Sequence, residues 1–319
     1  MSEIDLFAEH LQEKGTPDEK INRATDRIIH FTNTVVAGDD PLAALKAYCD
    51  KHIATSEDAT QSIIFLFWYH SFLKDKPAST YLITLLGTLD VIENQEKRLR
   101  LLFGDVLADE VFKGLAFPAL GSDLARYPEA INAYLQALQA RLGNEDCQKV
   151  LAGNHHDVDP SNFKEAKQRF ADYPDLPSFL KDRHQELVNK LQKHAETGEL
   201  WFEQYITPEV VEYVRNHQEI QTGILDGDRI LVSKIPYNPD AWLRETDPDL
   251  KRYHACHCPF VRSAILEKID VPDLWCYCSG GFTKLFFDYL LDREHKVELL
   301  ESVLSGGKTC RFAIQLTDP

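Results

Sequence analysis

The chain has 319 residues, of which 44% are hydrophobic and 27% charged, and it carries a formal net charge of −16. This composition is that of a globular protein with a substantial core, long enough for one large domain or two ordinary ones. The excess of acidic side chains repels phosphate backbones and anionic lipid headgroups, so we expect neither nucleic acid nor a membrane as a partner. The N-terminus lacks the basic start and the apolar block of a secretory signal, and the seven cysteines are an odd number. We therefore expect a cytoplasmic protein with reduced thiols rather than a disulfide framework.

Helical patterns dominate the chain up to about residue 217. Asp40-Pro41 and Thr207-Pro208 are helix starts, in which a polar capping residue precedes a proline at the first helical position. Residues 62–73 are apolar on nearly every side, which predicts a central, buried helix. The patterns also predict one long helix over 77–103 and further helices over 124–142, 160–172 and 178–197.

Strand patterns begin near residue 219. Segments 219–225 and 228–235 flank Asp226-Gly227, which is a strong hairpin signal. Farther along, we predict helices over 259–268 and 280–292 and strands over 296–304 and 309–316. The predicted fold class is α+β, with a mostly α-helical N-terminal region (1–217) followed by a smaller α+β C-terminal module (218–319) that ends in a β-hairpin. Trp201, Phe202 and Tyr205 lie near this boundary, and we expect them to pack between the two parts.

The terminal hairpin is predicted to place a carboxylate on an otherwise apolar face. With a two-residue Gly306-Gly307 turn, Glu301 pairs with Phe312, and strand alternation puts Glu301 and Cys310 on the same face as Phe312. A buried, unpaired carboxylate is costly, so Glu301 and Cys310 are expected to share a partner. The alternative is that this face is partly open to solvent, or that Arg311 or another basic side chain pairs with the glutamate.

Five of the seven cysteines lie in the last quarter of the chain. Two C-x-C pairs, Cys256 with Cys258 and Cys276 with Cys278, directly precede predicted helices, and Cys310 lies on the last predicted strand. In an extended backbone, residues i and i+2 point the same way, so each pair is expected to converge. Thiols at helix N-termini have a lowered pKa, which favours the thiolate.

Three interpretations of these cysteines remain open. The first is a bound metal, with zinc the expected ion, whose candidate ligands are Cys256, Cys258, Cys276, Cys278, Glu301 and Cys310. The second is a thiolate nucleophile, in which Cys278 or Cys258 attacks an electrophilic carbon and His254 or His257 acts as the base. The third is that the cysteines are small buried residues of a tight core.

The C-terminal motifs also carry a resemblance. C-H-C-P-F-V-R, W-C-Y-C-S-G-G-F and E-S-V-L-S-G-G-K-T-C-R-F-A-I resemble a group of largely uncharacterised bacterial and archaeal proteins. More distantly, this module is similar to the L-2-amino-thiazoline-4-carboxylic acid hydrolase family and to 4-vinyl reductase-type ligand-binding domains, which bind small hydrophobic molecules beside a zinc site. The resemblance implies that Glu301 and Cys310 match a Glu and the final Cys of that site. A further cysteine of the pattern has no counterpart here, so zinc binding would need Cys276 or Cys278 in its place.

The sequence therefore predicts a metal- and/or small-molecule-binding protein whose site is built from the C-terminal cysteines and Glu301. One alternative is a hydrolase of C–N bonds that uses a cysteine thiolate or a metal-activated water. Another is a structural zinc module in an interaction protein. The expected partner is a small-molecule ligand or substrate, and self-association into a homo-oligomer is left open. His155-His156-Asp157, predicted to lie in a loop, are further candidates for metal ligands or a base.

Overall fold

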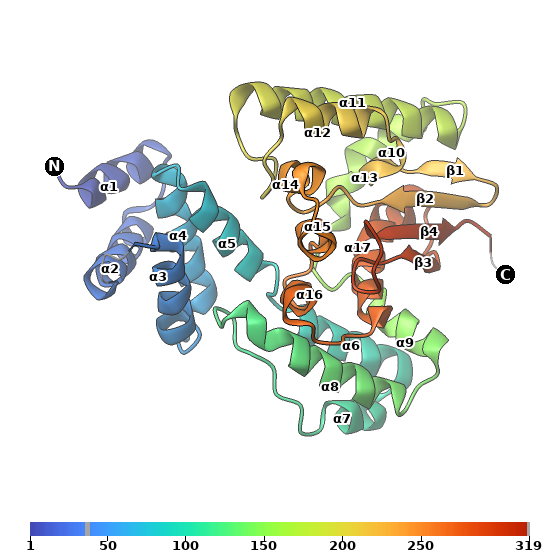
Figure 1. Cartoon of the computed structure of the whole chain (residues 1–319), viewed down its shortest axis with the longest axis horizontal. Coiled ribbons are helices and arrows are strands. Elements are labelled where there is room, and N and C mark those ends of the chain that lie inside the picture. The colour runs from blue at the N-terminus through green and yellow to red at the C-terminus, as the bar shows by residue number, and fades with distance from the viewer. Residues whose placement is uncertain (36–38, 318–319) are drawn as a thin grey trace. The chain divides into compact units, whose positions relative to one another are not determined.

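The computed structural model describes residues 1–35 and 39–317, which form two compact units (Figure 1). Unit 1 consists of Met1–Leu89 and Phe117–Tyr127, and unit 2 of Asp90–Ala116 and Pro128–Pro319. The predicted boundary between residues 217 and 218 lies inside unit 2. The fold class is α+β, as predicted, because a mostly helical chain carries a small antiparallel sheet near its C-terminus.

Unit 1 is built from helices. They are α1 (Glu3–Glu13), α2 (Asp18–Thr34), α3 (Pro41–Tyr48), the π-helical turn η1 (Cys49–Ile53), α4 (Ala59–Phe72), α5 (Lys76–Leu86) and the 3-10 turn η2 (Leu124–Arg126). Helix α4 packs against α2 and α5 and buries Ile63, Phe65 and Leu66, so the predicted central helix is confirmed. Asp40 caps α3 by accepting a hydrogen bond from the amide of Ala43 at 2.9 Å, as its position before a proline predicts.

The prediction of one helix over 77–103 is wrong, because the chain leaves the helical conformation between α5 and α6 (Val91–Phe103). Gly87 caps α5, and Asp90 has a φ of 57°, a left-handed conformation that aspartate tolerates better than most residues. The boundary between the two units falls at the same place, between Leu89 and Asp90. The break is therefore where the chain passes from one core to the other.

Unit 2 contains the remaining helices and the whole sheet. After α6 come α7 (Asp105–Phe112), α8 (Tyr127–Gln139), α9 (Asn144–Leu151), η3 (Pro160–Phe163), α10 (Lys164–Phe170), α11 (Leu176–Thr197), α12 (Pro208–Arg215) and α13 (Glu219–Thr222). The C-terminal part adds α14 (Pro239–Arg244), α15 (Pro248–Ala255), α16 (Arg262–Glu267), η4 (Asp273–Cys276) and α17 (Tyr277–Leu290). None of the described helices has the length and apolar character needed to cross a bilayer.

The sheet has four antiparallel strands in the order β1-β2-β4-β3. They are β1 (Ile224–Asp226), β2 (Arg229–Ser233), β3 (Val297–Glu301) and β4 (Arg311–Gln315). Asp226 pairs with Arg229, and Gly227 in the turn has a φ of 62°, so the predicted Asp-Gly hairpin is confirmed. Phe312 pairs with Val232 on one side and Leu299 on the other, which gives the sheet a continuous apolar face. Helix α17 packs against β3 and supplies the next layer (Figure 1).

The segment 219–225, predicted to be a strand, begins instead as the short helix α13 and becomes β1 only at Ile224. The carboxylate of Glu219 accepts hydrogen bonds from the hydroxyl of Ser233 at 2.8 Å and from Nη2 of Arg311 at 3.0 Å. Gln221 then reverses the chain with a φ of 62°. These contacts bind α13 to the end of β2 and the start of β4, and this tertiary context outweighs the local strand pattern.

Candidate functional site

Thiols from three segments meet in the interior of unit 2. Cys256 ends α15, Cys276 and Cys278 lie at the start of α17, and Cys310 directly precedes β4. Burial raises the pKa of Cys256 and Cys278, which keeps these thiols protonated at neutral pH. Cys256, Cys276 and Cys310 are close enough for a charge on one to shift the pKa of another. All seven cysteines of the chain are free thiols.

The expected extended backbone at 276–278 is wrong. Cys276 has φ −66° and ψ −11° and is followed directly by α17, because the 3-10 turn η4 leads into that helix without a break. On a helical turn, residues i and i+2 point to different sides, so Cys276 and Cys278 diverge. The sulfur of Cys276 lies 3.2 Å from the hydroxyl of Ser302. The sulfur of Cys258 accepts a hydrogen bond from the indole nitrogen of Trp275 at 3.1 Å.

The predicted pairing of Glu301 with Phe312 is also wrong. Glu301 lies opposite Arg311, because the register shifts between Leu299 and Glu301 and the connection over 302–310 is much longer than a two-residue turn. A carboxylate oxygen of Glu301 accepts hydrogen bonds from the amides of Lys308 at 2.5 Å and Thr309 at 3.4 Å. The glutamate therefore holds the hairpin connection closed.

Within residues 1–35 and 39–317, no group of three or more His, Cys, Asp or Glu side chains is arranged to hold a metal ion. Zinc binding by the cysteines and Glu301 stays a prediction, as does the structural zinc module. Two of the candidate ligands already have other partners: the Glu301 carboxylate binds backbone amides, and the Cys276 thiol contacts the hydroxyl of Ser302.

The predicted catalytic histidines occupy different surroundings. Nε2 of His257 lies 2.5 Å from the carbonyl oxygen of Ile235, and burial lowers the pKa of His257 to about 3, so the neutral ring donates this bond. His254 lies on α15, and burial lowers its pKa as well. In the described part of the chain, no hydrogen bond joins either histidine to Cys258 or Cys278. The thiolate–histidine pair, and with it the hydrolase activity, stays a prediction.

His155 and Asp157 form hydrogen bonds with α9 and α6. Nε2 of His155 lies 2.9 Å from the carbonyl of Val150 and 3.0 Å from that of Leu151, at the end of α9. Asp157 accepts a hydrogen bond from Asn94 of α6 at 2.9 Å. The ring of His156 packs edge-on against Phe282, with centroids 5.5 Å apart.

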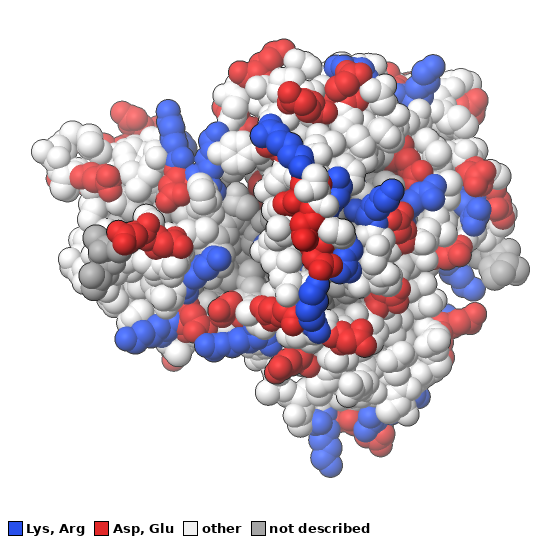
Figure 2. Space-filling view, in the orientation of Figure 1, with Lys and Arg blue, Asp and Glu red and all other residues white. Residues whose placement is uncertain are grey.

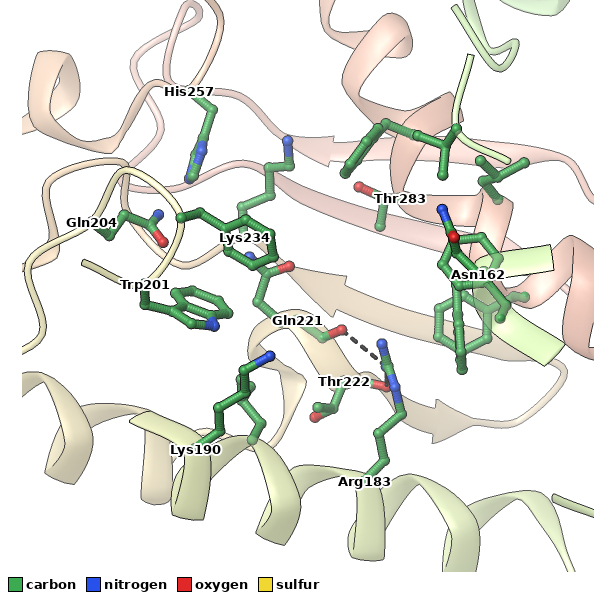
Figure 3. Close-up of a pocket in the computed structure, with 18 of the residues that line it drawn as sticks. Asn162, Arg183, Lys190, Trp201, Gln204, Gln221, Thr222, Lys234, His257 and Thr283 are labelled. Atoms are coloured by element: carbon green, nitrogen blue, oxygen red, sulfur yellow. Dashed lines mark hydrogen bonds between the residues drawn. The ribbon is translucent and has the colours of Figure 1, made fainter. Parts of the chain in front are cut away.

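A cavity of about 840 Å³ lies beside the cysteine region, between α11, α13 and α17 (Figure 3). His257 lines it, whereas none of the described cysteines does. This volume falls in the range of small-molecule binding sites, about 300–1,000 Å³. Aromatic rings make up much of the wall: Phe163, Trp201, Phe202, Phe282, Phe286 and Phe287. The cavity is therefore a candidate binding site for a small molecule in unit 2.

Cationic side chains enter the cavity from two sides. Arg183 and Lys190 rise from α11 along one wall, and Lys234 follows β2 on another (Figure 3). The ammonium group of Lys234 donates a hydrogen bond to the hydroxyl of Ser279 at 2.7 Å and lies 5.5 Å from the ring centroid of Phe282. Three cationic and two acidic side chains line the cavity, an excess of one positive charge in a chain with a net charge of −16. On the face of the molecule in Figure 2, by contrast, acidic and basic side chains are interspersed.

A tight turn over 201–204 forms another part of the wall. The amide of Trp201 donates to the carbonyl of Gln204 at 3.0 Å, and the reverse bond is 2.9 Å long. Phe202 has a φ of 54°, and its ring is 72% exposed, so the turn holds an aromatic ring at the mouth of the cavity. The indole nitrogen of Trp201 is buried and has no hydrogen-bond partner among the described residues.

The sequence-based reasoning missed most of this site. Trp201 and Phe202 were expected to pack between two parts of the chain, but they line the cavity. Arg183, Glu186, Leu187 and Lys190 are spaced three and four residues apart, so helical periodicity alone puts them on one face of α11. That signal was present, but it could not show that α17 and the 201–204 turn enclose the same face.

Residues 239–319, about a quarter of the chain, match the model of a family of unknown function, DUF6144. The matched region contains the C-terminal motifs on which the resemblance to uncharacterised proteins was based. No curated protein and no solved structure matches the chain. The distant similarity to the amino-thiazoline-carboxylic acid hydrolases and the 4-vinyl reductase-type domains thus has no support in these comparisons.

Proposed function

We propose that the protein binds a small organic molecule in the cavity between α11, α13 and α17, and that this molecule has a flat, largely apolar body. The observation that carries the proposal is the lining: six aromatic rings surround a space of about 840 Å³ that is large enough for a molecule of two or three fused rings. Aromatic side chains bind flat apolar molecules by offset stacking and edge contacts, in addition to the gain from removing apolar surface from water.

Polar groups in the same wall would orient the ligand. The indole N–H of Trp201 lacks a partner, and a buried donor left without one costs about 1–3 kcal/mol. A ligand oxygen or ring nitrogen placed beside Trp201 would recover that cost. Gln204, whose side-chain amide donates to the carbonyl of Pro236 at 3.2 Å, is held in place next to it.

The proposal is tested with N-phenyl-1-naphthylamine, a neutral aromatic probe whose fluorescence rises in apolar surroundings. We expect one probe molecule per chain. Thr283 of α17 lines the cavity, so Thr283→Trp fills the space and should weaken probe binding at least tenfold. Thr246, which is exposed between α14 and α15, supplies the matched control, and Thr246→Trp should leave binding unchanged. Absence of binding to the unaltered protein, or equal binding by both variants, would contradict the proposal.

A further inference from the structure

The guanidinium group of Arg183 is fixed in the wall of the cavity. Its central carbon lies 3.9 Å from the ring centroid of Phe286, and Nη1 donates to the carbonyl oxygens of Gln221 at 3.2 Å and Thr222 at 3.3 Å (Figure 3). Stacking on a ring fixes the plane of the guanidinium group, and the two carbonyls fix its rotation within that plane. Nε and Nη2 have no hydrogen-bond partner among the described residues, which leaves one N–H edge open.

Arg183 has no ion-pair partner among the described residues. The nearest acid on its own helix face, Glu186, forms an ion pair with Arg169 at 2.6 Å instead. In the described part of the chain, Arg183 takes part in no ion pair, although the side chain is partly buried and this burial lowers its pKa to about 10. A partly buried cation without a paired anion is unfavourable, because the hydration it loses is replaced only by two backbone carbonyls and the face of the Phe286 ring.

We propose that the ligand of this cavity carries a single negative charge on a carboxylate or a related oxyanion, and that the open N–H edge of Arg183 binds it. This inference rests on the proposed function, since it specifies the ligand of the same cavity. The planar edge of a guanidinium group matches the two oxygens of a carboxylate, and a charge-assisted pair of this kind is about twice as strong as a neutral hydrogen bond.

The other charges of the cavity favour a monoanion over a dianion. The cationic side chains exceed the acidic ones by a single charge. Glu203 lies in the same wall, and burial raises its pKa because the charged form is poorly solvated there. A second negative charge on the ligand would lack a second cation beside Arg183, because Lys190 is exposed and Lys234 lies at another wall of the cavity, where it donates to Ser279.

The test compares two probes that differ by one anionic group. 8-Anilino-1-naphthalenesulfonate is N-phenyl-1-naphthylamine with an added sulfonate, so the ratio of their dissociation constants isolates the contribution of the charge. We expect the sulfonate probe to bind the unaltered protein at least tenfold more tightly than the neutral one. 2-Naphthoate should likewise displace the neutral probe at least tenfold more effectively than 2-naphthamide.

Arg183→Gln removes the charge while keeping an N–H donor for the carbonyls of Gln221 and Thr222. This variant should lose the preference for the anionic probe and retain its affinity for the neutral probe within threefold. Lys181→Gln, an exposed position on the same helix, is the matched control and should bind both probes as the unaltered protein does.

The outcomes separate the two proposals. Equal affinity of the unaltered protein for both probes would overturn the anion site and leave the apolar cavity proposal intact. A loss of both probes in Arg183→Gln, when Lys181→Gln is normal, would overturn it too, because Arg183 would then only support the wall. If the unaltered protein binds neither probe, both proposals fail.

Discussion

The structure leaves no space for a methyl group at Gly281. We therefore expect Gly281→Ala to destabilise unit 2, although alanine has a higher helix propensity than glycine. A Cβ atom at Gly281 would lie 2.5 Å from the carbonyl carbon of Ala152 and 2.6 Å from the carbonyl oxygen of Gly153. The first distance falls about 0.9 Å short of the 3.4 Å at which ordinary contact begins. Because the opposing atoms are backbone, no side-chain rotation relieves the clash, and α17 must move away from the end of α9.

The expected magnitude follows from two opposing terms. Overpacking of this kind costs about 1–3 kcal/mol, and the rigid backbone partner favours the upper end. Replacing glycine by alanine within a helix returns about 1 kcal/mol. The net loss in the free energy of unfolding should therefore be about 2 kcal/mol.

Gly280 provides a matched control in the same helical turn. A Cβ atom there would lie 3.2 Å from a methyl group of Val297 and 3.3 Å from the ring of Phe312, and both are side-chain atoms that can adjust. Urea unfolding followed by tryptophan fluorescence, to which the buried Trp275 of unit 2 contributes, measures both variants. We expect Gly280→Ala to remain within about 1 kcal/mol of the unaltered protein. A fully stable Gly281→Ala, or an equal loss in both variants, would show that the backbone of Ala152 and Gly153 does not restrict this position.

Three further predictions concern Glu301, His155 and Cys310. Glu301→Ala removes the hydrogen-bond acceptor for the amides of Lys308 and Thr309. Hydrogen exchange at these two amides should therefore accelerate, and the free energy of unfolding should fall by about 1–3 kcal/mol. Unchanged exchange would contradict this role of Glu301. Burial lowers the pKa of His155 from 6.5 to about 4. The free energy of unfolding that this neutral histidine contributes is therefore fully present above pH 6.5 and should fall by about 3 kcal/mol as the pH is lowered to 4. Urea unfolding at several pH values should show a smaller fall in His155→Gln than in the unaltered protein, and an equal fall in both would contradict this role. A hydrogen bond from Cys276 lowers the pKa of Cys310, whereas burial raises that of Cys147, so mass spectrometry should find iodoacetamide modifying Cys310 before Cys147 as the pH rises from 7; faster modification of Cys147 would count against the thiol contacts described above.

Local signals predicted the parts of the fold that depend on a few neighbouring residues. Asp226-Gly227 specified a hairpin because its turn needs a positive φ that glycine supplies, and nothing elsewhere in the chain had to be known. The segment 62–73, which is apolar on nearly every side, predicted the buried helix α4 for a similar reason. These features give the α+β class and the central helix of unit 1.

Features that depend on residues far apart in the sequence could not be predicted from local patterns. The carboxylate of Glu219 draws its segment into a helical turn by binding Ser233 and Arg311, and Arg311 is 92 residues away in the sequence. The connection over 302–310 closes on the side chain of Glu301, so its register could not follow from the two glycines at 306 and 307. The cavity likewise joins α11 to α17, whose lining residues are about 100 positions apart.

The most direct test of the ligand site is a crystal structure of the protein grown with 2-naphthoate. We expect one naphthoate in the cavity, with its ring against Phe286 or Trp201 and its carboxylate within hydrogen-bonding distance of Nε or Nη2 of Arg183. A naphthoate bound elsewhere on the chain while the cavity holds only water, or one bound in the cavity with its carboxylate directed away from Arg183, would contradict it.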